Sequence, residues 1–91
     1  MRKVKVSNLK SDKGNTIPNQ FEIETKDGLY FQSYNAIIVF IDKKNGQWYF
    51  DEYYWNYSKT TSKYRNVFLG WSTKDCLENI KNGKIKLKNL N

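Results

Sequence analysis

The sequence contains no histidine, one cysteine and one proline. Without histidine, the chain lacks the most common general base and metal ligand of proteins. The single cysteine, Cys76, cannot form an internal disulfide, and no histidine is present to activate it as a nucleophile. The five glycines are scattered, so no glycine-rich phosphate loop is present. These absences predict a protein that is not an enzyme and has no cofactor or metal.

Long apolar segments are also missing. The longest apolar run, AIIVFI at 36–41, is far shorter than the about 20 residues that a membrane-spanning helix needs. The basic N-terminus MRKVKVSNLK has no apolar block behind it, unlike a secretory signal. Abundant lysine and asparagine are typical of AT-rich coding sequences, such as those of low-GC bacteria and their phages. We therefore expect a cytoplasmic protein in a bacterial host cell, without membrane contact.

Composition and charge indicate one globular domain over residues 1–91. The chain is 38% hydrophobic, 27% charged and 16% aromatic, with a net charge of +7. Residues 1–13 and 59–91 carry net charges of +4 and +6, whereas residues 14–58 carry −3. A cationic face attracts phosphates, acidic protein surfaces or anionic lipid. Alternatively, scattered lysines only keep a small domain soluble.

The first half of the chain predicts strands. Residues 2–6, RKVKV, alternate basic and apolar side chains as in an edge strand, and residues 7–20 predict a loop. FEIETKDGLYFQS at 21–33 predicts a hairpin. Pairing Thr25 with Leu29 around a three-residue turn would place the apolar side chains on one face, namely those of Phe21, Ile23, Leu29 and Phe31.

Two further strands follow. After a bend at residues 33–35, AIIVFID at 36–42 is apolar at every position but the last, so we expect a central strand that is covered on both faces. The dipeptide Asn45-Gly46 then predicts a turn into the strand QWYFDE at 47–52. The pairing register of these two strands stays open, because both are apolar at odd and even positions.

Two short helices are expected near the C-terminus. Thr60 or Thr61 can cap the first, with Gly70 at its end, and Ser72 with Asp75 predicts a capping box for the second, which Gly83 ends. Their apolar faces would consist of Tyr64, Val67, Phe68, Cys76, Leu77 and Ile80.

The tail KIKLKNLN at 84–91 predicts an edge strand with Ile85 and Leu87 facing inward. The fold class is therefore α+β. We expect an antiparallel sheet of four to six strands with two short helices packed on one face.

One group of carboxylates lies near the predicted strand pair: Asp42, Asp51 and Glu52. A catalytic pair or a cation site would need such a group. Solvated strand ends are the more common role for these residues, so we predict neither activity.

The stretch WYFDEYYWNY at 48–57, here called the aromatic segment, holds seven of the fifteen aromatic residues. A small domain needs large aromatic side chains in its core, and this role suits Trp48, Phe50 and, as one of two alternatives, Trp55. The tyrosines bring hydroxyls that must be hydrogen-bonded or solvated. Aromatic rings beside cations are typical of surfaces that stack bases and of protein interfaces. The predicted binding patch is Tyr54, Trp55, Tyr57, Lys59, Lys63 and Arg65. Lys63 and Arg65 are two positions apart and diverge on a helix, so only one of them need face the aromatic side.

Three stretches carry a resemblance to a known group of proteins: FQSYNAIIVFID, WNYSKTTSKYRNVFLG and NGKIKLKNLN. Over residues 20–91 the chain resembles a family of small uncharacterised proteins carried by phages and plasmids of low-GC bacteria. Its most specific part is YSKTTSKYRNVFLG, which this chain matches at Tyr57, Ser58, Thr60, Thr61, Lys63, Tyr64, Arg65 and Asn66. Residues 1–20, a possible edge strand plus loop, lie outside the resemblance.

The chain departs from that family at two positions. The family would place an aspartate at position 56 and an acidic residue at position 71, where this chain has Asn56 and Trp71. The resemblance implies a mobile-element setting and no particular activity.

Three functions follow as hypotheses. The first is a non-catalytic inhibitor of a bacterial defence system, of the anti-CRISPR kind, that binds a host protein or ribonucleoprotein through the basic aromatic patch. The second is a general DNA- or RNA-binding accessory protein of a phage or plasmid. The third is a cyclic-nucleotide sponge, which needs a closed pocket. The net charge of +7 argues against an acidic mimic of DNA.

Overall fold

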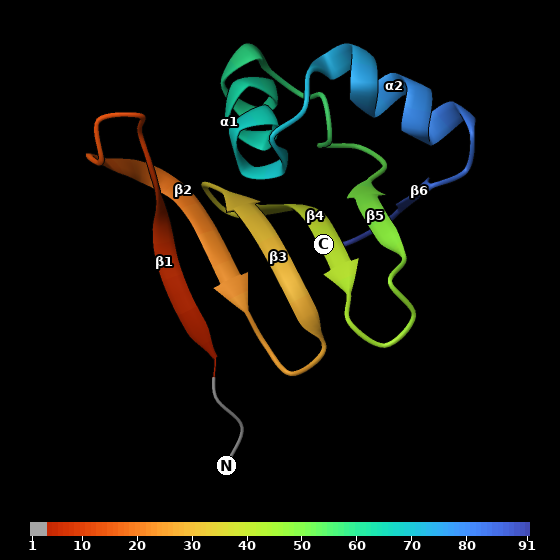
Figure 1. The fold of residues 1–91 in the computed structure, drawn as a ribbon, viewed down its shortest axis with the longest axis horizontal. Helices are drawn as coiled ribbons and strands as arrows, with labels where there is room; N and C mark the ends of the chain where they lie inside the picture. Colours follow the sequence, from red (N-terminus) through yellow and green to blue (C-terminus); the bar gives the residue numbers. More distant parts are fainter. Residues whose placement is uncertain (1–3) are drawn as a thin grey trace.

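Six strands and two helices make up the fold, which a computed structural model describes for residues 4–91 (Figure 1). The elements are β1 (Lys5–Lys10), β2 (Thr16–Glu24), β3 (Gly28–Ser33), β4 (Ala36–Asp42), β5 (Trp48–Asp51), α1 (Lys59–Leu69), α2 (Thr73–Lys81) and β6 (Ile85–Lys88). The α+β fold predicted from the sequence is confirmed. Within the described part of the chain, no helix is long and apolar enough to cross a membrane.

The strands form one sheet in sequence order, β1 to β6. Every neighbouring pair is antiparallel except β5 and β6, which run parallel. Parallel neighbours need a long connection, and the segment with α1 and α2 supplies it. The sheet was predicted to be antiparallel, and this holds for every pair except β5 and β6. The C-terminal strand β6 lies at an edge of the sheet, as expected.

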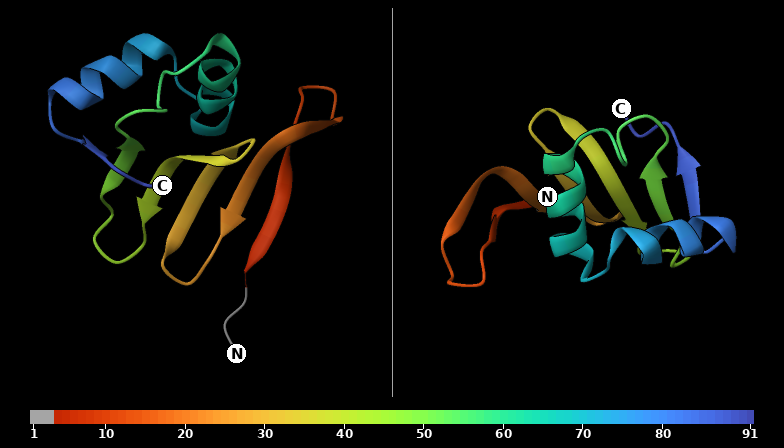
Figure 2. Two further views of the ribbon diagram at one scale, coloured as in Figure 1. Left: turned by 180° about the vertical axis from the view of Figure 1, so that it is seen from behind. Right: turned by 90° about the horizontal axis from the view of Figure 1, so that it is seen from above.

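Both helices lie on the same face of the sheet (Figure 2). Phe31, Val39 and Phe50 face each other on adjacent strands and form the buried centre of this layer. The helix layer covers them with aromatic rings: Phe68 of α1 stacks on Phe31 with ring centroids 5.3 Å apart. Burying such side chains removes a large apolar area from water, which is the main term that stabilises the fold.

On the opposite face, residues 4–91 form no helix (Figure 2). Tyr30, Phe40 and Tyr49 pair directly across β3, β4 and β5 on this face, with centroid distances of 4.5 and 6.0 Å. β4 is central, as expected, but the prediction that residues 36–42 are covered on both faces is wrong. On this second face, Phe40 of β4 packs between the rings of Tyr30 and Tyr49 on the two neighbouring strands.

The predicted hairpin register is also wrong. Glu24 pairs with Leu29, so the turn contains the two residues 26–27 rather than three. The Thr25 amide donates to the Gly28 carbonyl at 2.9 Å, and the Thr25 hydroxyl accepts from the Gly28 amide at 3.3 Å. This register splits the apolar residues between both faces, which the sheet accepts because both of its faces are apolar.

Gly28 has a packing role in this turn. A Cβ atom at position 28 would lie 2.0 Å from the carbonyl oxygen of Ile41. The close approach of β3 and β4 therefore requires glycine there.

The N-terminal segment contains more strand than the sequence indicated. Residues 2–3 of the predicted first strand lie outside the described residues, and β1 continues to Lys10. β2 begins at Thr16, so most of the predicted loop at 7–20 belongs to a hairpin. Asn8 contributes by donating from its side chain to the Ile17 carbonyl at 3.0 Å.

The first helix begins earlier than predicted. Ser58 caps it, accepting from the Thr61 amide, so Thr60 and Thr61 lie inside the first turn. Gly70 ends α1 in the left-handed region (φ 71°), as expected. Tyr64 and Phe68 pack on the core, but the exposed side chain of Val67 contradicts the predicted apolar face.

The second helix has the predicted capping box of Ser72 and Asp75. Cys76 is buried and Ile80 packs against the core, whereas Leu77 is exposed. In β6, Ile85 is buried as expected, but Leu87 is exposed.

Candidate functional site

The aromatic segment divides into a core part and a surface part. Trp48 stacks on Trp71 at 4.9 Å, and Phe50 stacks on Trp55 at 5.8 Å, both between the sheet and the helix layer. The connection to α1 is different, because the side chains of Tyr53 and Tyr57 are exposed there. Core and surface were alternatives from the sequence, and both apply: Trp48, Phe50 and Trp55 pack in the core, whereas Tyr53 and Tyr57 are exposed.

Asp51 fixes the backbone of this connection. Its carboxylate is 1% exposed and accepts from the amides of Tyr53 (3.1 Å), Tyr54 (2.8 Å) and Leu90 (2.8 Å), and from the side-chain amide of Asn91 (3.0 Å). Burial alone would raise the pKa of Asp51, but these hydrogen bonds, the one from Leu90 foremost, lower it below its usual range. Asp51 therefore holds the aromatic connection and the C-terminal residues together.

Arg65 does not belong to a surface patch. Its side chain is 0% exposed, which makes the prediction of one contiguous patch that includes Arg65 wrong. The guanidinium donates to the carbonyl of Trp55, to the side-chain oxygens of Asn56 (3.3 Å) and Asn66 (2.9 Å), and to the hydroxyl of Thr73 (3.0 Å). It joins the aromatic connection to both helices.

The Arg65 cation has only neutral partners among residues 4–91. The two salt bridges found there join surface lysines to Asp27 and Glu24. The guanidinium also lies over the Trp55 ring at 5.1 Å, which accounts for the inward position of that tryptophan. Burial lowers the pKa of Arg65, although an arginine stays charged in proteins.

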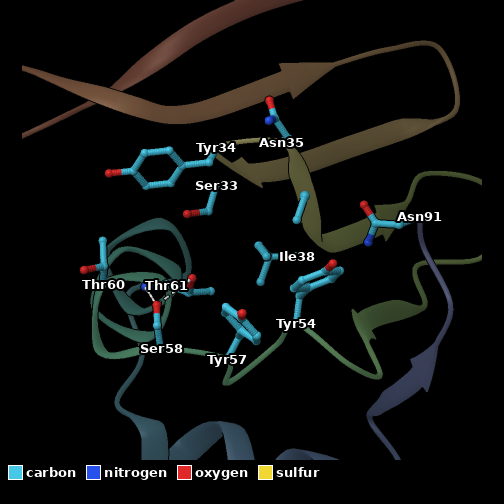
Figure 3. Close-up of a pocket in the computed structure, with 11 residues that line it drawn as sticks. Ser33, Tyr34, Asn35, Ile38, Tyr54, Tyr57, Ser58, Thr60, Thr61 and Asn91 are labelled. Atoms are coloured by element: carbon cyan, nitrogen blue, oxygen red, sulfur yellow. Dashed lines mark hydrogen bonds between the residues drawn. The ribbon is translucent and has the colours of Figure 1, made fainter.

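Two of the remaining predicted patch residues lie at a cleft. The cleft has a volume of about 530 Å³ and lies between the β3–β4 turn, the first turn of α1 and the aromatic connection (Figure 3). Tyr54 and Tyr57 line it directly. Lys59 and Lys63 lie on exposed positions of α1, and the Lys63 ammonium stands over the Tyr64 ring at 5.2 Å.

Every side chain that lines the cleft is uncharged. The lining residues are Ser33, Tyr34, Asn35, Ala36, Ile38, Tyr54, Tyr57, Ser58, Thr60, Thr61 and Asn91. Figure 3 shows Ser33 and Tyr34 on one wall, the first turn of α1 on another, and Ile38 between them and the two tyrosines of the connection. A mostly apolar hollow with a few hydrogen-bonding groups is the usual form of a small-molecule site.

A β-bulge contributes to the floor of the cleft. Phe31 pairs with Val39 but Gln32 pairs with Ile37, which leaves Ile38 as the extra residue of β4. Asn91 then bonds the amide (2.8 Å) and carbonyl (2.9 Å) of Ile37 with its side chain. Bulges re-aim side chains, and Ile38, the extra residue of this bulge, lines the cleft.

Ser33 carries an unsatisfied polar atom at this position. The residue is 4% exposed, and its Oγ atom has no hydrogen-bond partner among the described residues. Gln20, opposite Ser33 on β2, also has a buried side-chain oxygen without a partner there. Buried polar groups are nearly always hydrogen-bonded, so an unpartnered hydroxyl in a cleft wall has a free hydrogen-bonding site for a water or a ligand atom.

Tyr34 has a backbone conformation that is rare for a large side chain. It lies in the left-handed region with φ 54°, and the residue is 56% exposed and lines the cleft. Glycine and asparagine adopt this conformation far more readily than tyrosine. Strained residues of this kind concentrate at functional sites. Ser33 and Tyr34 are absent from the predicted patch because SYN indicated only a bend, although a bulky residue in a tight turn was a usable signal.

The described residues contain no group of three or more histidine, cysteine or carboxylate side chains that could hold a metal ion. Asp51 is occupied by its four donors, and the Asp42 carboxylate accepts from the Lys44 amide at 2.8 Å in a turn. These two carboxylates therefore have structural roles in the fold.

Comparison with known proteins gives a family. Residues 4–86 match the model of DUF8033, a family of unknown function. The chain belongs to this family. The DUF8033 match contains β1 to β5, both helices and every residue that lines the cleft except Asn91. No curated protein and no solved structure matches the chain significantly.

Proposed function

We propose that this protein is a non-catalytic module of a mobile element that captures a nucleotide in the cleft. The observation that carries the proposal is the cleft itself, in which tyrosine rings, hydroxyl groups and the unpartnered Ser33 Oγ surround one hollow of about 530 Å³. Rings stack on bases, and hydroxyls bond sugar and phosphate oxygens. The volume suits a ligand of nucleotide size, since small-molecule sites span about 300–1,000 Å³.

The chemistry of the cleft supports binding without turnover. Hydrolysis of a phosphate ester needs a group that activates water or neutralises developing charge. The side chains that line the cleft carry neither a carboxylate nor a cation, and the chain has no histidine. In the mobile-element setting that the sequence resemblance implies, a protein that removes a signal nucleotide from a host defence pathway would act as a sponge.

A DNA- or RNA-binding accessory protein is the second candidate. Lys59 and Lys63 are exposed on α1, beside the cleft, and give this side of the molecule a positive charge. A single-stranded nucleic acid would place one base in the cleft and its backbone along α1. A host protein as the partner has less support, because the burial of Arg65 breaks the continuous basic aromatic patch that such a partner would contact.

Calorimetric titration tests the proposal. The probes are the four 5′-nucleoside monophosphates, cyclic mono- and dinucleotides, and single-stranded oligonucleotides at two salt concentrations. Saturable binding of a mononucleotide or cyclic nucleotide supports the sponge, provided that mass spectrometry then finds the nucleotide intact. Binding of oligonucleotides alone, with a steep salt dependence, supports the second candidate.

Two tyrosine variants give a matched comparison. Tyr57 and Tyr53 are both exposed in the connection, but only Tyr57 lines the cleft. We expect Tyr57→Ala to weaken nucleotide binding by about tenfold or more, since a stacked ring contributes about 1–3 kcal/mol, and Tyr53→Ala to have a smaller effect. Equal affinities for the two variants would contradict the assignment of the cleft. Recovery of a host protein from nuclease-treated lysate, without nucleotide binding, would favour an inhibitor of the anti-CRISPR kind.

A further inference from the structure

We infer that the wall formed by Ser33 and the first turn of α1 is a phosphate subsite, so that the ligand is a phosphorylated nucleotide rather than a nucleoside. This inference rests on the proposed function and adds the position and chemistry of the anionic group. Two independent features of the structure support it, one from the helix and one from the sheet.

The helix contribution comes from the start of α1. The Thr61 amide is bonded to the Ser58 hydroxyl, but the amides of Lys59 and Thr60 have no hydrogen-bond partner among residues 4–91. The first turn contains no acidic residue that would neutralise the positive end of the helix dipole. Free amides and an uncompensated dipole attract an anion. Ser58, Thr60 and Thr61 all line the cleft, so this end of the eleven-residue helix borders the hollow.

The sheet contribution is the unpartnered hydroxyl of Ser33. It is buried to more than nine-tenths, lines the same cleft, and lies on the wall that adjoins α1 (Figure 3). A serine hydroxyl can donate one hydrogen bond and accept others. A phosphate oxygen between Ser33 and α1 would accept from this hydroxyl, and charge-assisted hydrogen bonds of that kind are stronger than neutral ones.

The rest of the cleft suits the uncharged part of a nucleotide. Ile38 provides an apolar floor, and the rings of Tyr54 and Tyr57 lie on the side away from Ser33 (Figure 3). A base would pack against these rings while the phosphate reaches the helix end. The cleft thus has one wall of hydrogen-bond donors, which suits a phosphate, and one aromatic wall, which suits a base.

Lys59 is the lysine of α1 that lies at the N-terminal end of the helix. It is the first residue of α1, whereas Lys63 lies one turn further on and its ammonium is placed over the Tyr64 ring. The two lysines are both exposed and therefore form a matched pair. Removal of the Lys59 charge should weaken phosphate binding more than removal of the Lys63 charge.

The experiment compares each 5′-nucleoside monophosphate with its own nucleoside by calorimetry. We expect the phosphorylated form to bind at least about tenfold more tightly, as one charge-assisted contact provides. This preference should shrink in Ser33→Ala and Lys59→Gln and persist in Lys63→Gln. In amide NMR spectra, inorganic phosphate alone should shift the Lys59 and Thr60 resonances.

The outcomes separate this inference from the proposed function. If a nucleoside and its monophosphate bind equally well, the phosphate subsite is wrong while nucleotide capture stands. The phosphate subsite is likewise wrong if Ser33→Ala keeps the full preference for phosphate. If neither form and no cyclic nucleotide binds but inorganic phosphate still shifts the two amides, the anion site stands and nucleotide capture is wrong. If nothing binds or shifts, both proposals fail.

Discussion

The guanidinium of Arg65 donates to the side-chain oxygen of Asn56 over 3.3 Å. A buried cation therefore bonds a neutral amide at a position where a carboxylate would fit. The same oxygen accepts from the Ser62 hydroxyl. The family that the sequence resembles would place an aspartate at position 56. In this fold that aspartate would supply the counter-charge that Arg65 lacks among the described residues.

We therefore predict that Asn56→Asp stabilises the protein. The substitution keeps the accepting oxygen and adds a negative charge beside a buried cation, a gain of about 1 kcal/mol, limited because residue 56 is exposed. Pairing with Arg65 would depress the pKa of the new carboxyl. The gain is then present above the unfolded pKa of about 3.9 and is lost as the pH falls through the folded value. Urea unfolding at pH 7 and pH 3 measures both effects.

Asn56→Ala is the matched control. It removes an acceptor from Arg65 and from Ser62, so we expect a lower free energy of unfolding at both pH values. A less stable Asn56→Asp protein at pH 7 would show that Arg65 does not need a counter-charge.

A second prediction concerns Asp51. Asp51→Asn should lower the free energy of unfolding at pH 7 by about 2–3 kcal/mol, because an amide cannot accept from four donors and the site is buried. Since the folded pKa of Asp51 is lowered, its contribution is present above the unfolded pKa and is lost as the pH falls through the folded value. The difference in free energy of unfolding between the parent protein and Asp51→Asn should therefore be smaller at low pH. Chemical unfolding of both proteins at pH 7 and pH 2.5 measures it. A constant difference would contradict this role of the carboxylate.

Local signals in the sequence predicted much of the fold. The capping box at Ser72, the end of α1 at Gly70 and the turn at Asn45-Gly46 are set by a few neighbouring residues, and each could be recognised. The hairpin register at Thr25 could not, because the predicted pairing holds only for a sheet with one apolar face. The row of Tyr30, Phe40 and Tyr49 gives the sheet a second apolar face, which only the strand order reveals.

The candidate site was predicted in part. Tyr54 and Tyr57 were identified from composition, and they do line the cleft. Arg65 was assigned to the patch because cations beside aromatic rings are typical of binding surfaces. Arginine is rarely buried without an acid partner, but here a network of neutral acceptors holds it inside. Ser33 could not be found, because its significance depends on the absence of a partner in three dimensions among the residues that the structure describes.

The burial of Arg65 leads to a third prediction. Arg65→Ala should destabilise the protein by about 3 kcal/mol or more, since it empties a buried site and leaves the carbonyl of Trp55 and the Thr73 hydroxyl without this donor. Lys63→Ala, on the same helix but exposed, should change stability by less than about 0.5 kcal/mol. Thermal unfolding of both variants checks the contrast. If Arg65→Ala left the midpoint unchanged, the network would not be structural.

The last prediction separates the stability of the cleft from its function. Tyr34 adopts a left-handed backbone conformation that asparagine tolerates better, and its exposed ring contributes little to the core. We expect Tyr34→Asn to keep the free energy of unfolding or raise it by up to about 1 kcal/mol, while nucleotide affinity falls by about tenfold. We expect Ser33→Ala likewise to keep the free energy of unfolding and lower nucleotide affinity, because removing an unpartnered buried hydroxyl does not destabilise a fold. Unfolding and calorimetric titration of both variants supply the two measurements. A loss of stability with unchanged affinity would mean that the fold, and not a ligand, requires the tyrosine and the serine at this cleft.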